Sequence, residues 1–318
     1  MEYTGLIQKY PIDRLLTEEE KQNQLKQKWR FDAQPVHQLS VIKMNSTFLE
    51  IADKYYGLKG VLSTAILLGM AILCLPALWL VIHMVLIAID PDGDPSGMSR
   101  DAALMNAAGI FVVFVIGVGA AGLWLLRKES FVYTHYPIRL NRKTRVVHVF
   151  RLDGTVLSVP WEKVFFTLGR CASPRQWDVR GHVLDADGAT VRESFALGAW
   201  SVGEQGKEVL RRYWEFIRRY MEDGPQEVFS IVQICLPIAG HKESVRTGFD
   251  RMFAEFSGAP FPVRMMGAVI ALAVLPGRWF AIRTSRIPKW PQAVEDENRV
   301  ELDDPYVKDA SVNPLAFS

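Results

Sequence analysis

Residues 61–89 read VLSTAILLGMAILCLPALWLVIHMVLIAI and contain no Asp, Glu, Lys or Arg. A second uncharged stretch runs from Ala102 to Leu126. A hydrocarbon core of about 30 Å takes roughly 20 helical residues to cross, and both stretches are longer than that. Because lipid leaves no partner for an unpaired backbone group, uncharged segments of this length form helices. The sequence therefore predicts a transmembrane hairpin of two helices.

The charges beside the two predicted helices indicate their orientation. The connector from Asp90 to Asp101 holds four aspartates and a single base, Arg100. The outer flanks instead carry bases, namely Lys54, Lys59, Arg127 and Lys128. Since excess Lys and Arg stay on the cytoplasmic side, we expect residues 1–59 and 127–318 to lie in the cytosol. Both termini are then cytosolic.

The second apolar stretch contains Gly117-Val-Gly-Ala-Ala-Gly122, which has the glycine spacing of a dinucleotide-binding fingerprint. A dinucleotide fold needs a polar helix next and an acidic residue about 20 positions further on. Here Leu123–Leu126 continue the apolar run, and residues 137–147 contain no acid. We interpret the small residues as a packing seam between membrane helices. Such a seam serves the hairpin and self-association equally well.

The connector also resembles a calcium-binding loop. Asp90, Asp92, Asp94 and Asp101 have the spacing of calcium ligands in such a loop. However, Pro95 stands where the sharp turn needs glycine, and the last ligand is Asp in place of the longer, bidentate Glu. We interpret the connector as an ordinary tight turn, with weak calcium binding as the alternative.

Composition points away from several classes of protein. The net charge of +2 gives no indication of a nucleic-acid partner. The three cysteines (Cys74, Cys171, Cys235) are too far apart to predict a disulfide framework or a metal site. The six histidines show no metal-ligand spacing, and no nucleophile elbow or phosphate-binding loop is present. We therefore assign no cofactor, metal or catalytic residue, which favours a binding protein over an enzyme.

After the hairpin the pattern changes to short β-rich runs, at residues 138–140, 146–150, 155–157, 164–168, 182–184 and 190–191. Asp153-Gly154 and Asp187-Gly188 predict hairpins with type I′ turns. An amphipathic helix is expected over 202–222, with Ser201 and Glu204 spaced as a capping box. The sequence thus predicts an α+β cytosolic module: a curled antiparallel sheet or barrel with one covering helix.

Together with the turn Val159-Pro-Trp-Glu162, this order of strands and closing helix resembles the pleckstrin-homology-like modules that bacteria tether behind a pair of membrane helices. The resemblance covers residues 131–223. In addition, Tyr136–Thr144 and Arg283–Pro291 resemble an uncharacterised proteobacterial family of two-pass membrane proteins. Members of that family tend to be encoded near type VI secretion effectors and immunity proteins. This resemblance implies the bacterial inner membrane and supplies no catalytic residues.

The C-terminal third is less regular. A short helix is expected within 241–256. Residues 265–275 are apolar between Arg264 and Arg278, but a helix of that length spans only about 17 Å. We interpret it as a helix buried in the protein, with a position in the membrane interface as the alternative. The expected divisions are 1–59 (N-terminal segment), 60–127 (hairpin), 128–225 (β module), 226–292 (helical region) and 293–318 (acidic, extended tail).

Six bases just inside the second helix form a candidate binding surface: Arg127, Lys128, Arg139, Arg142, Lys143 and Arg145. Juxtamembrane bases gain on the order of 1 kcal/mol each from anionic lipid. The acidic tail of the same chain is a different partner for this surface, and plain solvation is a third interpretation.

Taken together, these observations favour a non-enzymatic, membrane-anchored interaction protein with a protein partner. The family resemblance implies an immunity or accessory role beside a secreted toxin or secretion component. An anionic-lipid-binding scaffold and an enzyme acting on a membrane-near substrate are the alternatives.

Overall fold

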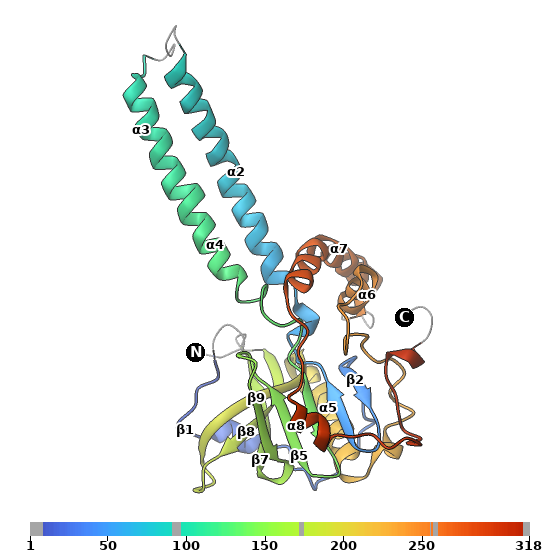
Figure 1. Cartoon of the computed structure of the whole chain (residues 1–318). Helices are drawn as coiled ribbons and strands as arrows, with labels where there is room; N and C mark the ends of the chain where they lie inside the picture. Colours follow the sequence, from blue (N-terminus) through green and yellow to red (C-terminus); the bar gives the residue numbers. More distant parts are fainter. Residues whose placement is uncertain (1–8, 91–96, 172–174, 255, 257–259, 314–318) are drawn as a thin grey trace. The chain divides into compact units, whose positions relative to one another are not determined.

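The computed structural model describes residues 9–90, 97–171, 175–254, 256 and 260–313 (Figure 1). The chain forms two compact units. Unit 1 comprises Met1–Leu58, Tyr133–Gly267 and Arg286–Ser318, and unit 2 comprises Lys59–Val132 and Ala268–Ser285. One folded unit is thus assembled from three separate stretches of sequence. This corrects the expected series of five consecutive divisions.

Unit 1 contains a five-stranded antiparallel sheet in the order β2-β3-β4-β5-β6. Its strands are β2 (Val41–Met44), β3 (Phe48–Ile51), β4 (Ile138–Asn141), β5 (Val146–Phe150) and β6 (Val156–Pro160). Ile51 of β3 pairs with Ile138 of β4, on the far side of the hairpin sequence. The N-terminal residues therefore supply two strands of the module, which the strand pattern after residue 131 did not reveal.

A second antiparallel sheet has the order β1-β9-β8-β7. Its strands are β1 (Arg14–Leu15), β7 (Val164–Arg170), β8 (Gln176–Leu184) and β9 (Thr190–Val202), with β1 followed by the short helix α1 (Glu18–Gln22). The short helix η3 (Trp161–Lys163) connects the two sheets. All six β-rich runs expected after the hairpin are strands, so an α+β fold with antiparallel sheets is confirmed.

The two predicted hairpins are present, but their turns differ from the prediction. Gly154 and Gly188 have φ of +87° and +66°, whereas Asp153 and Asp187 are not among the residues with positive φ. A type I′ turn needs positive φ at both central residues. Arg151 N donates to Thr155 O at 2.8 Å, which closes a three-residue loop whose last residue, Gly154, is left-handed. Such loops combine a type I turn with a bulge.

Helix α5 (Gly203–Glu222) packs into the core of unit 1. Trp214 stacks on Trp161 with ring centroids 5.6 Å apart, and Phe166 of β7 touches both rings. The apolar stripe predicted for this helix is therefore core. The capping box is wrong, because β9 continues through Ser201 to Val202 and no side chain caps the helix at Val202.

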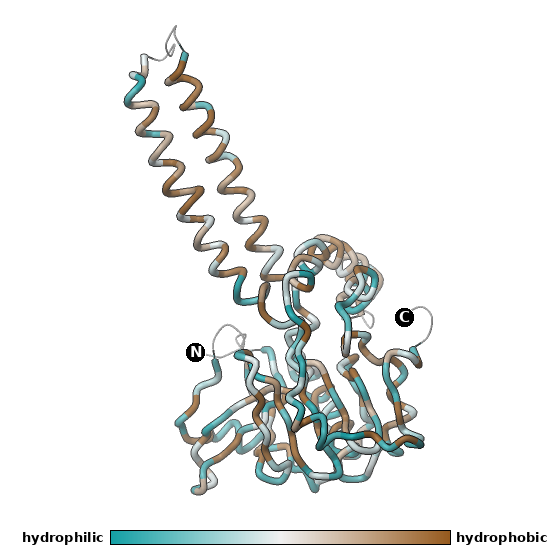
Figure 2. The backbone as a smooth tube through the Cα atoms, in the orientation of Figure 1, coloured by the Kyte–Doolittle hydropathy of each residue, from teal (hydrophilic) through white to brown (hydrophobic). Residues whose placement is uncertain are grey.

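Unit 2 contains a pair of long apolar helical segments that run side by side (Figures 1 and 2). The first is α2 (Val61–Ile89), which continues through Pro76. The second is formed by α3 (Arg100–Ile110), the π-helical segment η2 (Phe111–Val118) and α4 (Gly119–Leu126). A Cβ atom at Gly122 would lie 2.3 Å from Sδ of Met70, so this glycine allows close contact with α2. Because Gly117–Gly122 is helical, the dinucleotide interpretation does not apply.

The base of this helix pair is held by Glu129. Its carboxylate accepts hydrogen bonds from the backbone N–H groups of Gly60 (2.9 Å) and Ser63 (2.6 Å), at the start of α2. These N–H groups have no partner within the helix, and a negative charge there also complements the helix dipole. Ser63 and Ser130 pair through their hydroxyls at 2.9 Å. Both helical segments are therefore joined at the end where the chain enters and leaves.

Within the described residues, three helices are long and apolar enough to cross a membrane: Tyr56–Ile89, Arg100–Leu126 and Phe261–Thr284. The third, α7, overturns the expectation of a short buried helix at 265–275. It runs for 24 residues, because neither Arg264 nor Arg278 ends it. Its side chains Met265 and Leu272 are more than half exposed.

The C-terminal third also contains α6 (Val245–Ala254), within the range expected for a helix, α8 (Gln292–Glu297) and the short helices η4 (Pro225–Glu227) and η5 (Ala310–Val312). Asp304 accepts hydrogen bonds from Ser46, and Lys308 pairs with Met44 as an isolated bridge. The described part of the tail is therefore bound to unit 1, unlike the extended tail that we expected. Half of the candidate calcium loop, including Asp92 and Asp94, lies outside the described residues.

We predict that the fragment 128–225 will not fold by itself. It lacks β2 and β3, so β4 loses the partner strand with which it pairs along its whole length. Exposed, unpaired strand edges promote association. Near-ultraviolet circular dichroism and NMR dispersion of the fragment should be those of an unfolded or aggregated chain, with the detergent-solubilised full-length protein as the control. A cooperative thermal transition of the fragment would contradict this.

Candidate functional site

A row of polar side chains crosses the five-stranded sheet of unit 1. Glu50 of β3 pairs in register with Arg139 of β4, which pairs with His148 of β5, which pairs with Ser158 of β6. Strand side chains alternate between the two faces, and the neighbours of these residues, such as Leu49 and Leu140, enter the core. The polar row therefore lies on the face turned away from the core.

The C-terminal residues of unit 1 cover this row. The guanidinium of Arg139 lies between the rings of Phe48 and Trp290, 4.4 and 4.9 Å from their centroids. Its Nε donates to Glu50 at 2.9 Å and its Nη1 donates to Glu295 of α8 at 3.0 Å. The Arg139 side chain is only 3% exposed. A buried charge of this kind is tolerated because two carboxylates and two aromatic faces surround it.

The same cover reaches His148 and Asn141. The His148 imidazole bonds the Ser158 hydroxyl at 2.8 Å, and its other nitrogen lies 3.4 Å from a Glu297 carboxylate oxygen. Burial lowers the pKa of His148; Glu297 acts against that shift, and Arg139 adds to it. Asn141 donates to the backbone oxygen of Glu297 at 3.1 Å. The C-terminal segment is thus attached to β4 and β5 by polar contacts.

Between the sheet and its cover lies a cavity of about 180 Å³. Its lining combines bases with acids: Lys43, His135, Arg139 and Lys289 with Glu50 and Glu295. Trp290 also lines it, and the Trp290 Nε1 atom is buried with no hydrogen-bond partner among the described residues. A buried N–H without a partner is costly to the fold. This cavity is our candidate binding site.

The six bases of the predicted surface have different surroundings in the structure. Arg139 is buried, which corrects its assignment to an exposed surface, because the C-terminal segment covers its face of the sheet. Lys143 pairs with Glu301, Arg145 pairs with Glu162 and Glu222, and Arg142 donates to the backbone of Ser46. Arg127 and Lys128 belong to unit 2.

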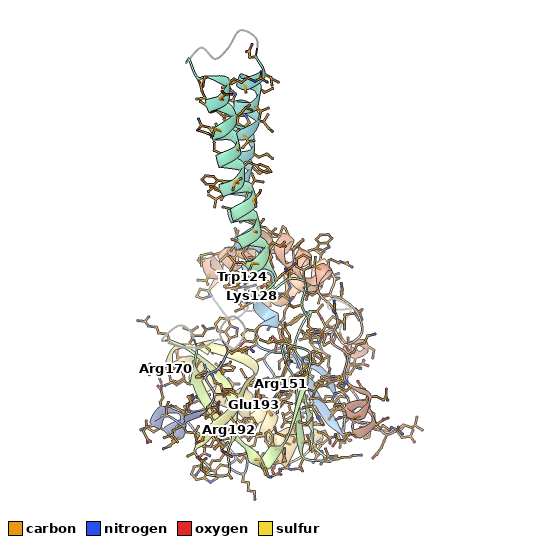
Figure 3. All side chains as sticks on the ribbon, turned by 60° about the vertical axis from the view of Figure 1, so that its left-hand side comes forward. Trp124, Lys128, Arg151, Arg170, Arg192 and Glu193 are labelled. Atoms are coloured by element: carbon orange, nitrogen blue, oxygen red, sulfur yellow. The ribbon has the colours of Figure 1, made fainter. Side chains whose placement is uncertain are left out.

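The acidic tail was one of the partners expected for this surface, and two ion pairs agree with that expectation. Glu295 contacts Arg139 and Glu301 contacts Lys143. In unit 2, Arg127 is exposed, and the Lys128 ammonium lies 4.8 Å from the ring centroid of Trp124 (Figure 3). Arg151, the base that follows Arg145 in the sequence, pairs with Glu193 and is labelled in the same view.

A second polar cluster is buried in unit 1 around Asp178 of β8. Lys54, which follows β3, forms an ion pair with one carboxylate oxygen, and the Arg180 Nε donates to the other at 2.7 Å. The Cys171 thiol donates to Asp178 at 3.2 Å, and the Tyr10 hydroxyl lies 3.4 Å away. Residues that are far apart in the sequence thus meet at one carboxylate.

The ionisation states of this cluster are those of a structural ion pair. Burial raises the pKa of Asp178, but Lys54 and Arg180 outweigh it and hold that pKa below its usual range. Asp178 likewise outweighs the effect of burial on Lys54 and raises the lysine pKa. Burial raises the pKa of Cys171 to about 12, so its thiol is protonated at neutral pH and is a poor nucleophile. The cluster holds segments together; it offers no activated nucleophile.

Sequence reasoning missed this cluster, although one signal was present. Asp178, Arg180 and His182 alternate along β8, so this part of one strand face carries polar groups. The sequence did not show that Lys54, which is far away in the chain, pairs with Asp178 on this face. Among the described residues, no group of three or more His, Cys, Asp and Glu side chains is placed to hold a metal ion.

Comparison with known proteins gives one match. A family model described as a family of unknown function, DUF6708, matches residues 115–302, which is more than half of the chain. No curated protein and no solved structure matches the chain. The expected kinship with an uncharacterised family is confirmed at this level.

We predict that Arg139→Met destabilises the protein far more than Lys143→Met. The first change leaves Glu50 buried without its counter-charge, which costs about 3–5 kcal/mol. The second removes a pair whose partners are 40% and 70% exposed, which contributes about 0–1 kcal/mol. Both variants replace a base that pairs with the C-terminal segment, so they are matched controls. Urea unfolding of the full-length protein in detergent measures the difference, and equal losses would contradict the burial argument.

Proposed function

The chain belongs to this family of unknown function, and we propose that it is a membrane-anchored, non-enzymatic interaction protein. The observation that carries the proposal is the exposure of the two longest apolar segments. Only 11% of the most apolar window in each of Tyr56–Ile89 and Arg100–Leu126 is buried within the protein. Apolar surface of that extent is unfavourable in water and favourable in lipid.

The proposed topology follows from chain connectivity. The helix pair begins after β3 and ends before β4, and these two strands pair directly. Both ends of the helix pair must therefore lie on the same side of a membrane. The bases Lys59, Arg127 and Lys128 at these ends favour the cytoplasmic side. We propose the bacterial inner membrane, with unit 1 and both termini in the cytosol.

Unit 1 has features that support a pleckstrin-homology-like binding module. Two antiparallel sheets are followed by α5, whose aromatic side chains share their core. The strands from β3 to β9 and α5 occur in the order expected of such a module. In this proposal the membrane helices are an insertion between its strands β3 and β4.

The cavity beside Arg139 is the proposed partner site. The two segments that carry the family resemblance, 136–144 and 283–291, meet there through Arg139 and Trp290. Lys43 and Lys289 on its lining favour an acidic or acceptor-rich group on the partner. The resemblance further supports an immunity or accessory role in interbacterial competition, with a secreted toxin or secretion component as the partner.

The alternative is an anionic-lipid scaffold built on the juxtamembrane bases. Arg127 remains exposed and favours it. Lys143 and Arg145 already pair with carboxylates, and Arg139 is buried, so they contribute less to lipid binding than an unpaired base would.

Topology is tested by cysteine labelling. Cys74→Ser serves as the background, because Cys171 and Cys235 are buried with their pKa raised to about 12. In intact bacterial spheroplasts a membrane-impermeant maleimide should label Gly97→Cys in the connector. Glu204→Cys, which replaces an exposed side chain of unit 1, should be labelled only after lysis. Recovery of the protein in the soluble fraction, or the reverse labelling pattern, would overturn the proposed topology.

The immunity role is tested by survival. Co-expression with the toxin encoded beside its gene should restore growth of a susceptible strain. Lys289→Glu reverses a charge at the cavity and should abolish protection, whereas Lys163→Glu, another exposed lysine, should keep it. Killing that is unchanged by the wild-type protein rejects the immunity role. Equal protection by both variants rejects the cavity as the partner site.

A further inference from the structure

Helix α7 carries an apolar stripe on its exposed side. Met265, Val269, Leu272, Pro276 and Trp279 follow one another at intervals of four and three residues, so they lie along one face of the helix. All five side chains are exposed. The helix contains three arginines and no acidic residue. An exposed face of this kind, on a basic helix, requires an apolar partner.

The opposite side of α7 packs on the first turn of α2 inside unit 2. A Cβ atom at Gly60 would lie 2.3 Å from Cα of Arg278, and one at Gly277 would lie 2.0 Å from Oγ1 of Thr64. The Thr64 hydroxyl donates to the backbone oxygen of Val274 at 3.1 Å. The two helices therefore touch backbone to backbone. Their contact lies at the end of α2 where the apolar hairpin begins.

Length alone would let α7 cross a membrane, because 24 residues extend about 36 Å. Chain connectivity prevents it. The residues that follow α7 belong to unit 1, where Arg286 O accepts from Thr134 N at 2.8 Å and Lys308 pairs with Met44. The chain before α7, from residue 133 onward, belongs to unit 1 too. A single crossing would place the two parts of one folded unit on opposite sides of the bilayer.

We propose that α7 lies in the plane of the membrane surface, at the base of the hairpin, with its apolar stripe in the acyl chains. This inference rests on the proposed membrane anchoring. Arg264 and Arg283 are exposed and reach the headgroups of anionic lipid, and Trp279 is of the type enriched at this boundary. Arg278 instead turns inward and donates to the backbone oxygen of Lys59 at 3.0 Å.

The contacts of α7 favour a lipid surface over a second copy of the chain as the partner of its apolar stripe. Helix α7 is packed on the entry turn of a helix pair whose own surface is apolar. Interfacial helices of this kind sit about 5–10 Å into the boundary between headgroups and acyl chains. The helix is held at that depth by Gly60 and Thr64.

The test places nitroxide labels in the full-length protein, reconstituted in vesicles of phosphatidylethanolamine and phosphatidylglycerol. Single cysteines replace Met265, Val269, Leu272 and Trp279 in the Cys74→Ser background. Collision rates with oxygen and with a water-soluble nickel complex give the depth of each label. Ile72→Cys, near the middle of α2, is the membrane reference, and Glu204→Cys is the water reference.

We expect the four labels on α7 to share one shallow depth, about 5–10 Å below the phosphates. A crossing helix would instead spread the labels at 265 and 279 over about 21 Å, and this spread would overturn the inference. Nickel accessibility equal to that at position 204, or shielding from both reagents, would overturn it as well. A water-accessible label at position 72 would reject membrane anchoring itself, which is a separate outcome.

Discussion

The pairing of β3 with β4 is the constraint on which the rest of the structure depends. Their ladder joins residues 48–51 to 138–141, and every residue of the hairpin lies between them in the sequence. A hydrogen-bonded ladder fixes its two strands about 5 Å apart. The apolar helices must therefore leave and return at one place, so an anchored version of this sheet requires an even number of crossings. The same reasoning supports our proposal that α7 stays on one side, because the chain before it and the chain after it both belong to unit 1.

The buried Arg139 explains why the C-terminal residues pack on the sheet of unit 1. Arg139 lies on the sheet face that is solvated in many antiparallel proteins. Here Trp290 and Glu295 cover it, so that its charge meets two carboxylates and two rings. Burying an unpaired charge costs several kcal/mol, so cover and sheet depend on each other. The cavity beside Arg139 lies between the sheet and this cover, and Glu50, Arg139, Trp290 and Glu295 all line it.

The sequence predicted the part of the fold that is encoded locally. Alternating residues and Asp-Gly turns located the strands from β4 to β9, and helical periodicity located α5. It did not reveal β2 and β3, which join the sheet only through the pairing of β3 with β4, a strand that lies beyond the hairpin in the sequence. Arg139 was placed on an open surface, because alternation identifies the face of a strand and does not reveal what covers that face. Arg278 was taken as the end of an apolar segment, whereas its side chain is buried against Lys59, a contact between distant residues.

The interrupted sheet also sets the order in which the protein can form during synthesis. Strands β2 and β3 leave the ribosome before the hairpin, but β4, the second partner of β3, emerges only after both apolar helices have been made. Until then β3 presents an open edge, and Glu50 lacks its ion-pair partner Arg139. Trp290 and Glu295, which cover the arginine, appear later still. The sheet is therefore completed only after both apolar segments have been synthesised, and until then the open edge of β3 is available for pairing with another chain.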